Sequence, residues 1–170
     1  AIIVGLLAGV LIGLINGVVI AYTGVPPFIT TLATMLISSG IAMILTGGAP
    51  IYYPHKFFTS YGDYKILGLS CSVYTWILFL ILIGILLHKT KFGAKIYAIG
   101  GNERAAIYSG INVKKTKIIL YCISGLMSAI GGFLFLARIG SVTLDSGGTF
   151  QMQSIAMVVV GGVLLEGGKG

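Results

Sequence analysis

The sequence predicts an all-α fold, a polytopic bundle of transmembrane helices, and two observations support this prediction. Of the 170 residues, 56% are hydrophobic and only 9% are charged, whereas about a quarter of the residues in a typical soluble domain are charged. The apolar residues also gather in runs of about 20 residues, the length of helix that crosses a bilayer core about 30 Å thick. The chain is therefore expected to be a multi-pass membrane protein.

Four apolar runs are long enough to cross a membrane, and a fifth is too short. The spans are expected over residues 1–21, 28–48, 67–87 and 118–137. The last run, residues 154–165, is expected to form either a re-entrant half-helix or the start of a span broken at Gly161 and Gly162. We expect residues 1–170 to form one transmembrane domain, which we interpret as a fragment of a longer protein.

The distribution of cationic side chains predicts the orientation of these spans. Seven of the eleven lysines and arginines lie between residues 88 and 117: Lys89, Lys91, Lys95, Arg104, Lys114, Lys115 and Lys117. The positive-inside rule places this connection in the cytoplasm and the connections at 49–66 and 138–153 outside. Topology therefore explains the net charge of +7, and no nucleic-acid partner is expected.

Small residues recur at a spacing of four in two of the predicted spans. They are Gly5, Gly9, Gly13 and Gly17 in the first span and Ser124, Ser128 and Gly132 in the fourth. Such faces allow helix backbones to approach closely. We favour packing within one bundle over a dimerisation motif.

Polar side chains at the first two spans have two interpretations each. Asn16 lies inside the first span and must either hydrogen-bond another helix or face a wet pathway, because an unpaired buried amide is costly. Thr30, Thr31 and Thr34 follow Pro26-Pro27-Phe28 and either bond back to their own helix or line a polar passage.

Two neutral amides precede the short last run. Gln151 and Gln153 lie in the segment 143–156, which is expected to be an outside loop leading into the membrane. Their amides donate and accept hydrogen bonds, which suits either a hydroxyl-rich solute or the capping of a broken helix.

The sequence contains no pattern typical of an enzyme. The four acidic residues and two histidines are scattered, without metal-ligand spacing or a nucleophile beside a base. Cys71 and Cys122 are far apart and are interpreted as free thiols. No catalytic residue, metal or cofactor is therefore expected.

A short helix is predicted inside the basic connection, over residues 103–109. Asn102 suits the N-cap, Glu103 complements the helix dipole, and Gly110 suits the C-terminal stop. We expect Gly100-Gly101 to end the preceding structure and the helix to lie at the inner membrane surface. A helix of about two turns is not stable alone, so the flanking spans and a partner protein are expected to hold it.

Several segments together resemble the permease subunits of ABC importers for ribose and related sugars. They are "NGVVIAYTGVPPFITTLATM" (16–35), "YAIGGNERAAIYSGINVKKTKIILYCISGL" (97–126), "GGFLFLAR" (131–138) and "IAMVVVGGVLLEGGKG" (155–170). The resemblance implies a permease of the plasma (inner) membrane that forms the pathway for a sugar or sugar-like solute. It implies three partners: a cytoplasmic ABC ATPase that hydrolyses the ATP, a second permease copy or paralogue, and an extracytoplasmic solute-binding protein.

The resemblance also assigns residues to two roles. The coupling helix that docks into the ATPase would comprise Asn102, Glu103, Arg104, Ala105, Ala106, Ser109 and Gly110, with a small exposed surface at Ala105, Ala106 and Ser109. The translocation pathway would include Asn16, Phe28, Thr31, Gln151 and Gln153. The chain departs from the family's usual Asn-Pro-Glu-Ala-Ala-Arg pattern, because Glu103 comes one place early and Arg104 and Ile107 replace an acid and a base.

Three other functions are compatible with parts of the sequence. A secondary transporter or channel would need ionisable residues at the middle of the membrane, and the predicted spans contain none. A membrane scaffold whose basic loop binds anionic lipid would explain the lysines, although not the capped helix. The same permease fold moving a nucleoside or a signalling molecule fits the sequence as well as a sugar importer does.

Overall fold

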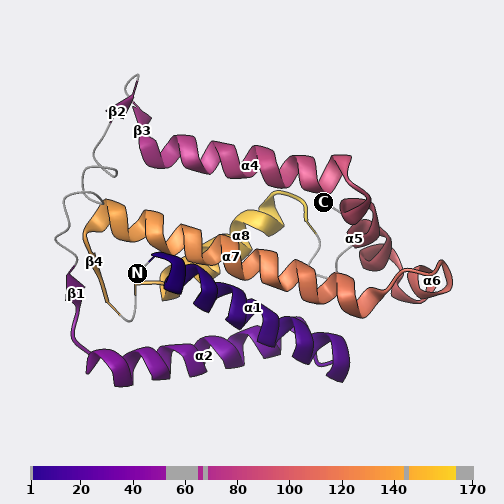
Figure 1. Cartoon of the computed structure of the whole chain (residues 1–170), viewed down its shortest axis with the longest axis horizontal. Coiled ribbons are helices and arrows are strands. Elements are labelled where there is room, and N and C mark those ends of the chain that lie inside the picture. The colour runs from indigo at the N-terminus through magenta and orange to yellow at the C-terminus, as the bar shows by residue number, and fades with distance from the viewer. Residues whose placement is uncertain (1, 53–64, 67–68, 144–145, 164–170) are drawn as a thin grey trace. The chain divides into compact units, whose positions relative to one another are not determined.

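The computed structural model describes residues 2–52, 65–66, 69–143 and 146–163 (Figure 1). Its helices are α1 (Ile2–Thr23), α2 (Pro27–Thr46), α4 (Cys71–Lys89), α5 (Lys91–Gly101), α6 (Glu103–Tyr108), α7 (Val113–Ile139) and α8 (Gly148–Val160). Its strands are β1 (Ile51–Tyr52), β2 (Lys65–Ile66), β3 (Leu69–Ser70) and β4 (Ser141–Val142). The predicted all-α fold class is therefore confirmed. The chain forms two compact units, one of residues 1–77 and 117–144 and the other of residues 78–116 and 145–170.

Four of these helices, α1, α2, α4 and α7, are long and apolar enough to cross a membrane. All four have bounds within two residues of the prediction, except for the starts of α4 and α7. Helix α4 begins at Cys71 instead of residue 67 because β2 and β3 pair just before it, and α7 begins at Val113, five residues before the apolar run at 118. Residue 1, residues 67–68 of the predicted third span and residues 164–165 of the predicted last segment lie outside the described residues.

Helix α7 begins early because Asn112 caps it. The Asn112 side-chain oxygen accepts a hydrogen bond from the Lys115 amide at 3.0 Å, and its carbonyl accepts one from the Thr116 hydroxyl at 2.9 Å. An N-cap of this kind satisfies backbone donors that have no partner inside the helix. The helix therefore extends from the apolar run into the basic segment.

A short strand pair joins two connections of the first unit. β1 pairs antiparallel with β4, with Ile51 opposite Val142 and Tyr52 opposite Ser141. The connections that follow α2 and α7 therefore meet at the same end of this unit. This agrees with the charge pattern, which places both connections on one side of the membrane.

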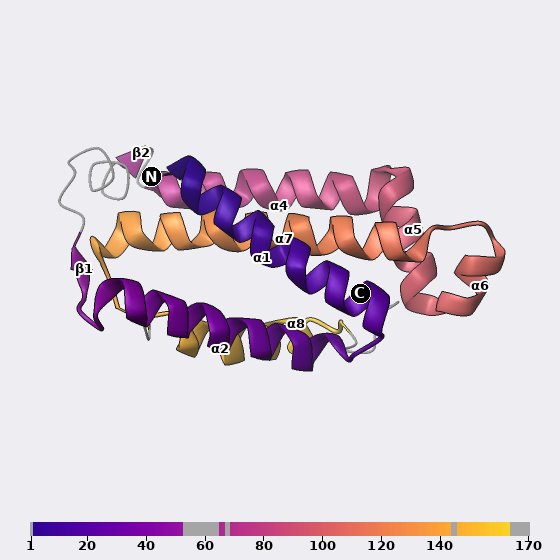
Figure 2. The same cartoon turned by 60° about the horizontal axis from the view of Figure 1, so that its bottom comes forward.

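Helices α1 and α7 cross with their backbones in close contact (Figure 2). A Cβ atom built on Gly9 would lie 2.6 Å from the Gly125 carbonyl oxygen and 2.7 Å from the Ala129 Cβ. One built on Gly13 would collide with the Tyr121 carbonyl. The predicted glycine face of α1 is therefore an interhelical packing face, where small residues replace the hydrophobic driving force that lipid does not supply.

The partner face on α7 is rotated by one residue from the prediction. A Cβ built on Gly125 would collide with the Gly9 carbonyl, whereas no described atom lies within 4 Å of a Cβ built on Gly132. The predicted face of Ser124, Ser128 and Gly132 is therefore wrong for the contact. Ser124 and Ser128 border a pocket beside it instead.

The described side chains bury little apolar volume. No large side chain among them is fully buried, and residues such as Ile44 and Leu45 on α2 are about four-fifths exposed (83% and 80%). In membrane proteins such side chains pack against lipid or against further helices. Their exposure here therefore does not require a hydrophobic core within this chain.

We predict that Gly125→Val will reduce the free energy of unfolding by about 1–3 kcal/mol more than Gly132→Val, because only the first overpacks the α1 contact. Both substitutions place the same β-branched residue on the same helix. Unfolding of the detergent-purified chain in increasing dodecyl sulfate, followed by circular dichroism, measures the difference. Equal losses of stability would contradict the α1–α7 contact.

Candidate functional site

A pocket of about 480 Å³ lies within the first unit, beside the α1–α7 contact. The lining residues that carry polar side chains are Asn16, Thr31, Tyr121, Ser124 and Ser128. The others are Gly5, Ala8, Gly9, Ile12, Gly13, Gly125 and Ala129. The pocket exists because α1 and α7 contribute residues too small to fill the space between the backbones.

Asn16 contributes to both helix packing and the pocket. Its side chain is buried, with 8% exposed. The Thr34 hydroxyl of α2 lies 2.8 Å from the Asn16 Oδ1 atom, and this hydrogen bond joins α1 to α2. Asn16 also lines the pocket. Of the two interpretations of this residue, the interhelical hydrogen bond is therefore present, and the side chain still borders a polar space.

The threonines of α2 bond back to their own helix. The Thr31 hydroxyl donates to the Pro27 carbonyl at 2.9 Å, and the Thr30 hydroxyl lies 3.4 Å from the Pro26 carbonyl. This is the local pairing expected of hydroxyls inside helices. Thr31 also lines the pocket, whereas Thr30 is buried outside it.

The chemistry of the pocket is neutral and polar. Hydroxyl and amide groups donate and accept hydrogen bonds, and no Asp, Glu, Lys, Arg or His is among the described residues that line it. A solute with several hydroxyls finds partners of both kinds in such a site. A charged solute would lose its hydration without gaining a counter-charge, which is costly.

The structure brings together only part of the predicted pathway. Asn16 and Thr31 line the pocket, whereas Phe28, on α2, does not and is 55% exposed. Gln151 and Gln153 belong to the second unit. They lie within α8, which begins at Gly148, so the prediction of a loop over 143–156 is wrong at its second half.

Helix α8 ends at the predicted glycine pair. The Gly162 amide donates to the Val159 carbonyl at 3.0 Å and the Val163 amide to the Val158 carbonyl at 3.2 Å, with Gly162 at φ +88°. This is a Schellman motif, in which a left-handed residue lets backbone amides satisfy the last carbonyls. The two glutamines are therefore not needed to cap this end of the helix.

The predicted helix in the basic connection is present as α6. The Asn102 side-chain oxygen accepts a hydrogen bond from the Ala105 amide at 3.0 Å, so Asn102 is the N-cap. At the other end Gly110 has φ +78°, its amide donates to the Ile107 carbonyl, and the Ile111 amide donates to the Ala106 carbonyl. Both predicted boundary signals are confirmed.

A second helix in this connection, α5, was not predicted. It includes Gly100 and ends at Gly101, so the preceding structure does end at the predicted glycine pair, although it is a helix that contains both glycines. The glycines and lysines obscured it, although two signals were available. Thr90 is a strong N-cap residue, and Phe92, Ile96 and Ile99 recur at the spacing of one helical face.

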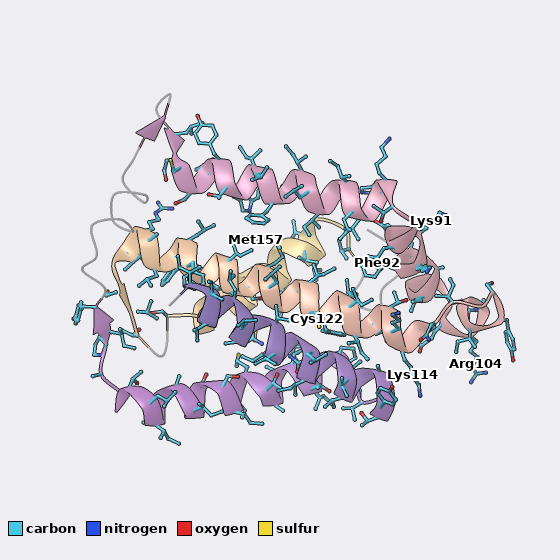
Figure 3. All side chains as sticks on the ribbon, viewed as in Figure 1. Lys91, Phe92, Arg104, Lys114, Cys122 and Met157 are labelled. Carbon is cyan, nitrogen blue, oxygen red and sulfur yellow. The ribbon has the colours of Figure 1, made fainter. Side chains whose placement is uncertain are left out.

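The exposed surface of α6 is larger and more aromatic than predicted. Ala106 is only 3% exposed, whereas Ile107 is 55% and Tyr108 is 91% exposed. Arg104 points outward from the helix (Figure 3). The prediction that Ala106 belongs to the exposed surface is therefore wrong, and Arg104, Ile107 and Tyr108, which share a face at spacings of three and four, were the available signal.

The titratable residues do not form a metal site in the part of the chain that the structure describes. No three His, Cys, Asp or Glu side chains gather there. Cys71 and Cys122 are both free thiols.

Comparison with known proteins gives a consistent result over the whole chain. The model of the family described as "Branched-chain amino acid transport system / permease component" matches residues 1–168. The ribose import permease protein of Bacillus subtilis is 40% identical over 91% of this chain and 49% of its own length. The galactose/methyl galactoside import permease protein of Escherichia coli K12 is 42% identical, over 95% of this chain and 50% of its own length.

A third relative also matches this chain over about half of its own length. The ribose import permease protein of Escherichia coli K12 is 38% identical over 100% of this chain and 54% of its own length. The chain thus spans about half the length of the curated relatives it matches. No solved structure matches it.

We predict that Asn16 and Thr34 are energetically coupled by about 0.6 kcal/mol, and by no more than roughly 1.7 kcal/mol, as measured for interhelical hydrogen bonds in membranes. A double-mutant cycle of Asn16→Leu and Thr34→Val, read from unfolding in dodecyl sulfate, gives this coupling energy. The matched cycle of Asn16→Leu with Thr31→Val should give a value near zero. Equal coupling in the two cycles would show that the Asn16–Thr34 hydrogen bond does not stabilise the fold.

Proposed function

Because the chain belongs to the branched-chain amino acid transport system / permease component family, we propose that it is part of the membrane subunit of an ATP-driven importer for a sugar. The observation that carries the choice of solute is its identity of about 40% to permeases named for ribose and galactose import. Because the chain spans only half of these relatives, further spans would complete the pathway. The permease itself performs no covalent chemistry.

The pocket supports a neutral solute over an amino acid. The family description names branched-chain amino acids, which carry an ammonium and a carboxylate at neutral pH. The pocket offers hydroxyls and one amide, and no charged group among its described lining. A sugar hydroxyl can pair with these groups as both donor and acceptor, so the lining matches a sugar and opposes a zwitterion.

Three partners follow from this proposal. A cytoplasmic ABC ATPase would bind the basic connection, a second permease copy or paralogue would close the pathway, and a solute-binding protein would deliver the sugar from outside. ATP binding would act by favouring one of two packings of the helices, inward-open or outward-open. For ATP binding to act at a distance in this way, the contact between the ATPase and the permease must be more favourable in one packing than in the other.

The face of α6 that carries Arg104, Ile107 and Tyr108 is the proposed ATPase contact. Arginine and tyrosine are enriched among the interface residues that contribute most of the binding energy. Tyr108 is almost fully exposed in the chain by itself and is therefore available for such a contact. Asn102 and Gly110 hold this face in place by fixing the two ends of the helix. Ala106 supports it from the buried side.

We predict that the full-length permease, reconstituted with its ATPase and binding protein, will accumulate radiolabelled ribose or galactose only when ATP is present. Leucine should not accumulate, because the pocket lacks counter-charges for it. Leucine uptake would contradict the assignment of a sugar. Uptake driven by an ion gradient without ATP would contradict the importer itself, and uptake of a nucleoside alone would assign the same fold to a different solute.

A further inference from the structure

Helices α4 and α5 meet at a joint formed by Thr90. The Thr90 hydroxyl donates to the Leu86 carbonyl of α4 at 2.6 Å and accepts from the Gly93 amide of α5 at 3.3 Å. One side chain therefore satisfies a carbonyl at the end of one helix and an amide at the start of the next. This fixes the direction in which α5 leaves α4.

Gly93 brings α5 directly onto the last turn of α4. It is buried, and a Cβ atom built on it would collide with the backbone of Leu87. Every residue other than glycine would push the two helices apart at this point. The rings of His88 and Tyr97 add a contact across the same joint, with centroids 6.1 Å apart.

A single residue also joins α5 to α6. The Asn102 amide donates to the Ala98 carbonyl of α5 at 3.1 Å, and its side-chain oxygen accepts from the Ala105 amide of α6 at 3.0 Å. Asn102 is thus the C-cap of one helix and the N-cap of the other. The two helices also contact each other, and Ala106 is buried.

We propose that Thr90, Gly93 and Asn102 are positioning residues that make α4, α5 and α6 move as one body. A displacement of α6 by a bound ATPase would then reach the transmembrane helix α4, because hydrogen bonds of Thr90 and Asn102 and the backbone contact at Gly93 fix the two joints. This inference rests on the proposed function, since it takes α6 as the ATPase contact. It concerns the transmission of the motion and not the contact itself.

The test compares ATP hydrolysed with solute taken up in proteoliposomes that hold the complete importer. Thr90→Val removes both hydrogen bonds at nearly constant volume, whereas Thr90→Ser keeps the hydroxyl. Gly93→Ala adds one methyl group at the joint, and Gly84→Ala adds the same group on α4, where no described atom lies within 4 Å. These form two matched pairs.

In Thr90→Val and Gly93→Ala the rate of ATP hydrolysis should stay at the wild-type level, while the ATP hydrolysed per solute taken up should rise by about fivefold or more. A factor of about five is the lower end of ordinary allosteric coupling. Thr90→Ser and Gly84→Ala should match the wild type. If Gly93→Ala does not assemble, the Thr90 pair decides.

Two results would overturn the inference while leaving the proposed function intact. One is an unchanged ratio of ATP to solute in Thr90→Val, and the other is a parallel fall of hydrolysis and uptake, which indicates lost docking instead of lost transmission. Wild-type uptake that needs no ATP would instead overturn the proposed function, so the two failures are distinguishable.

Discussion

The structure depends on one constraint: inside a membrane the chain must pair its own backbone N–H and C=O groups. The long helices do so internally. In the connection of residues 88–117, which is expected to lie outside the membrane, the side chains of Thr90, Asn102 and Asn112 cap α5, α6 and α7 in turn. The same constraint governs the polar side chains of the spans. Thr31 bonds back to its own helix, and the Asn16 side-chain oxygen accepts a hydrogen bond from Thr34 of α2.

Packing and chemistry are connected through the small residues of α1 and α7. Where Gly9, Gly13 and Gly125 meet, the two backbones touch, and beside this contact the missing side chains leave a pocket. Its polar groups are neutral, since a charge placed there would have to be paired within the membrane. A site formed in this way suits a solute that carries many hydroxyls and no charge.

The features that depend only on neighbouring residues were predicted from local signals in the sequence. The apolar runs gave the spans, and Asn102 and Gly110 gave the ends of α6.

Features that depend on tertiary contacts were not predictable in this way. Ala106 is buried, and α6 contacts α5, a helix hidden by its glycines. The choice of Gly125 over Gly132 depends on the angle at which α1 crosses α7. Gln151 and Gln153 look like loop residues because the first turns of α8 are polar.

We propose that capped joints present the Tyr108 face of α6 to a cytoplasmic ATPase. The most direct measurement places a photoreactive phenylalanine analogue at Tyr108 or, as a matched control, at Tyr52, which is also well exposed but lies on β1 at the predicted outer side. Illumination of the assembled importer in membranes should produce an adduct with the ATPase from position 108 and none from position 52. No adduct from position 108, or an adduct from position 52, would contradict this proposal.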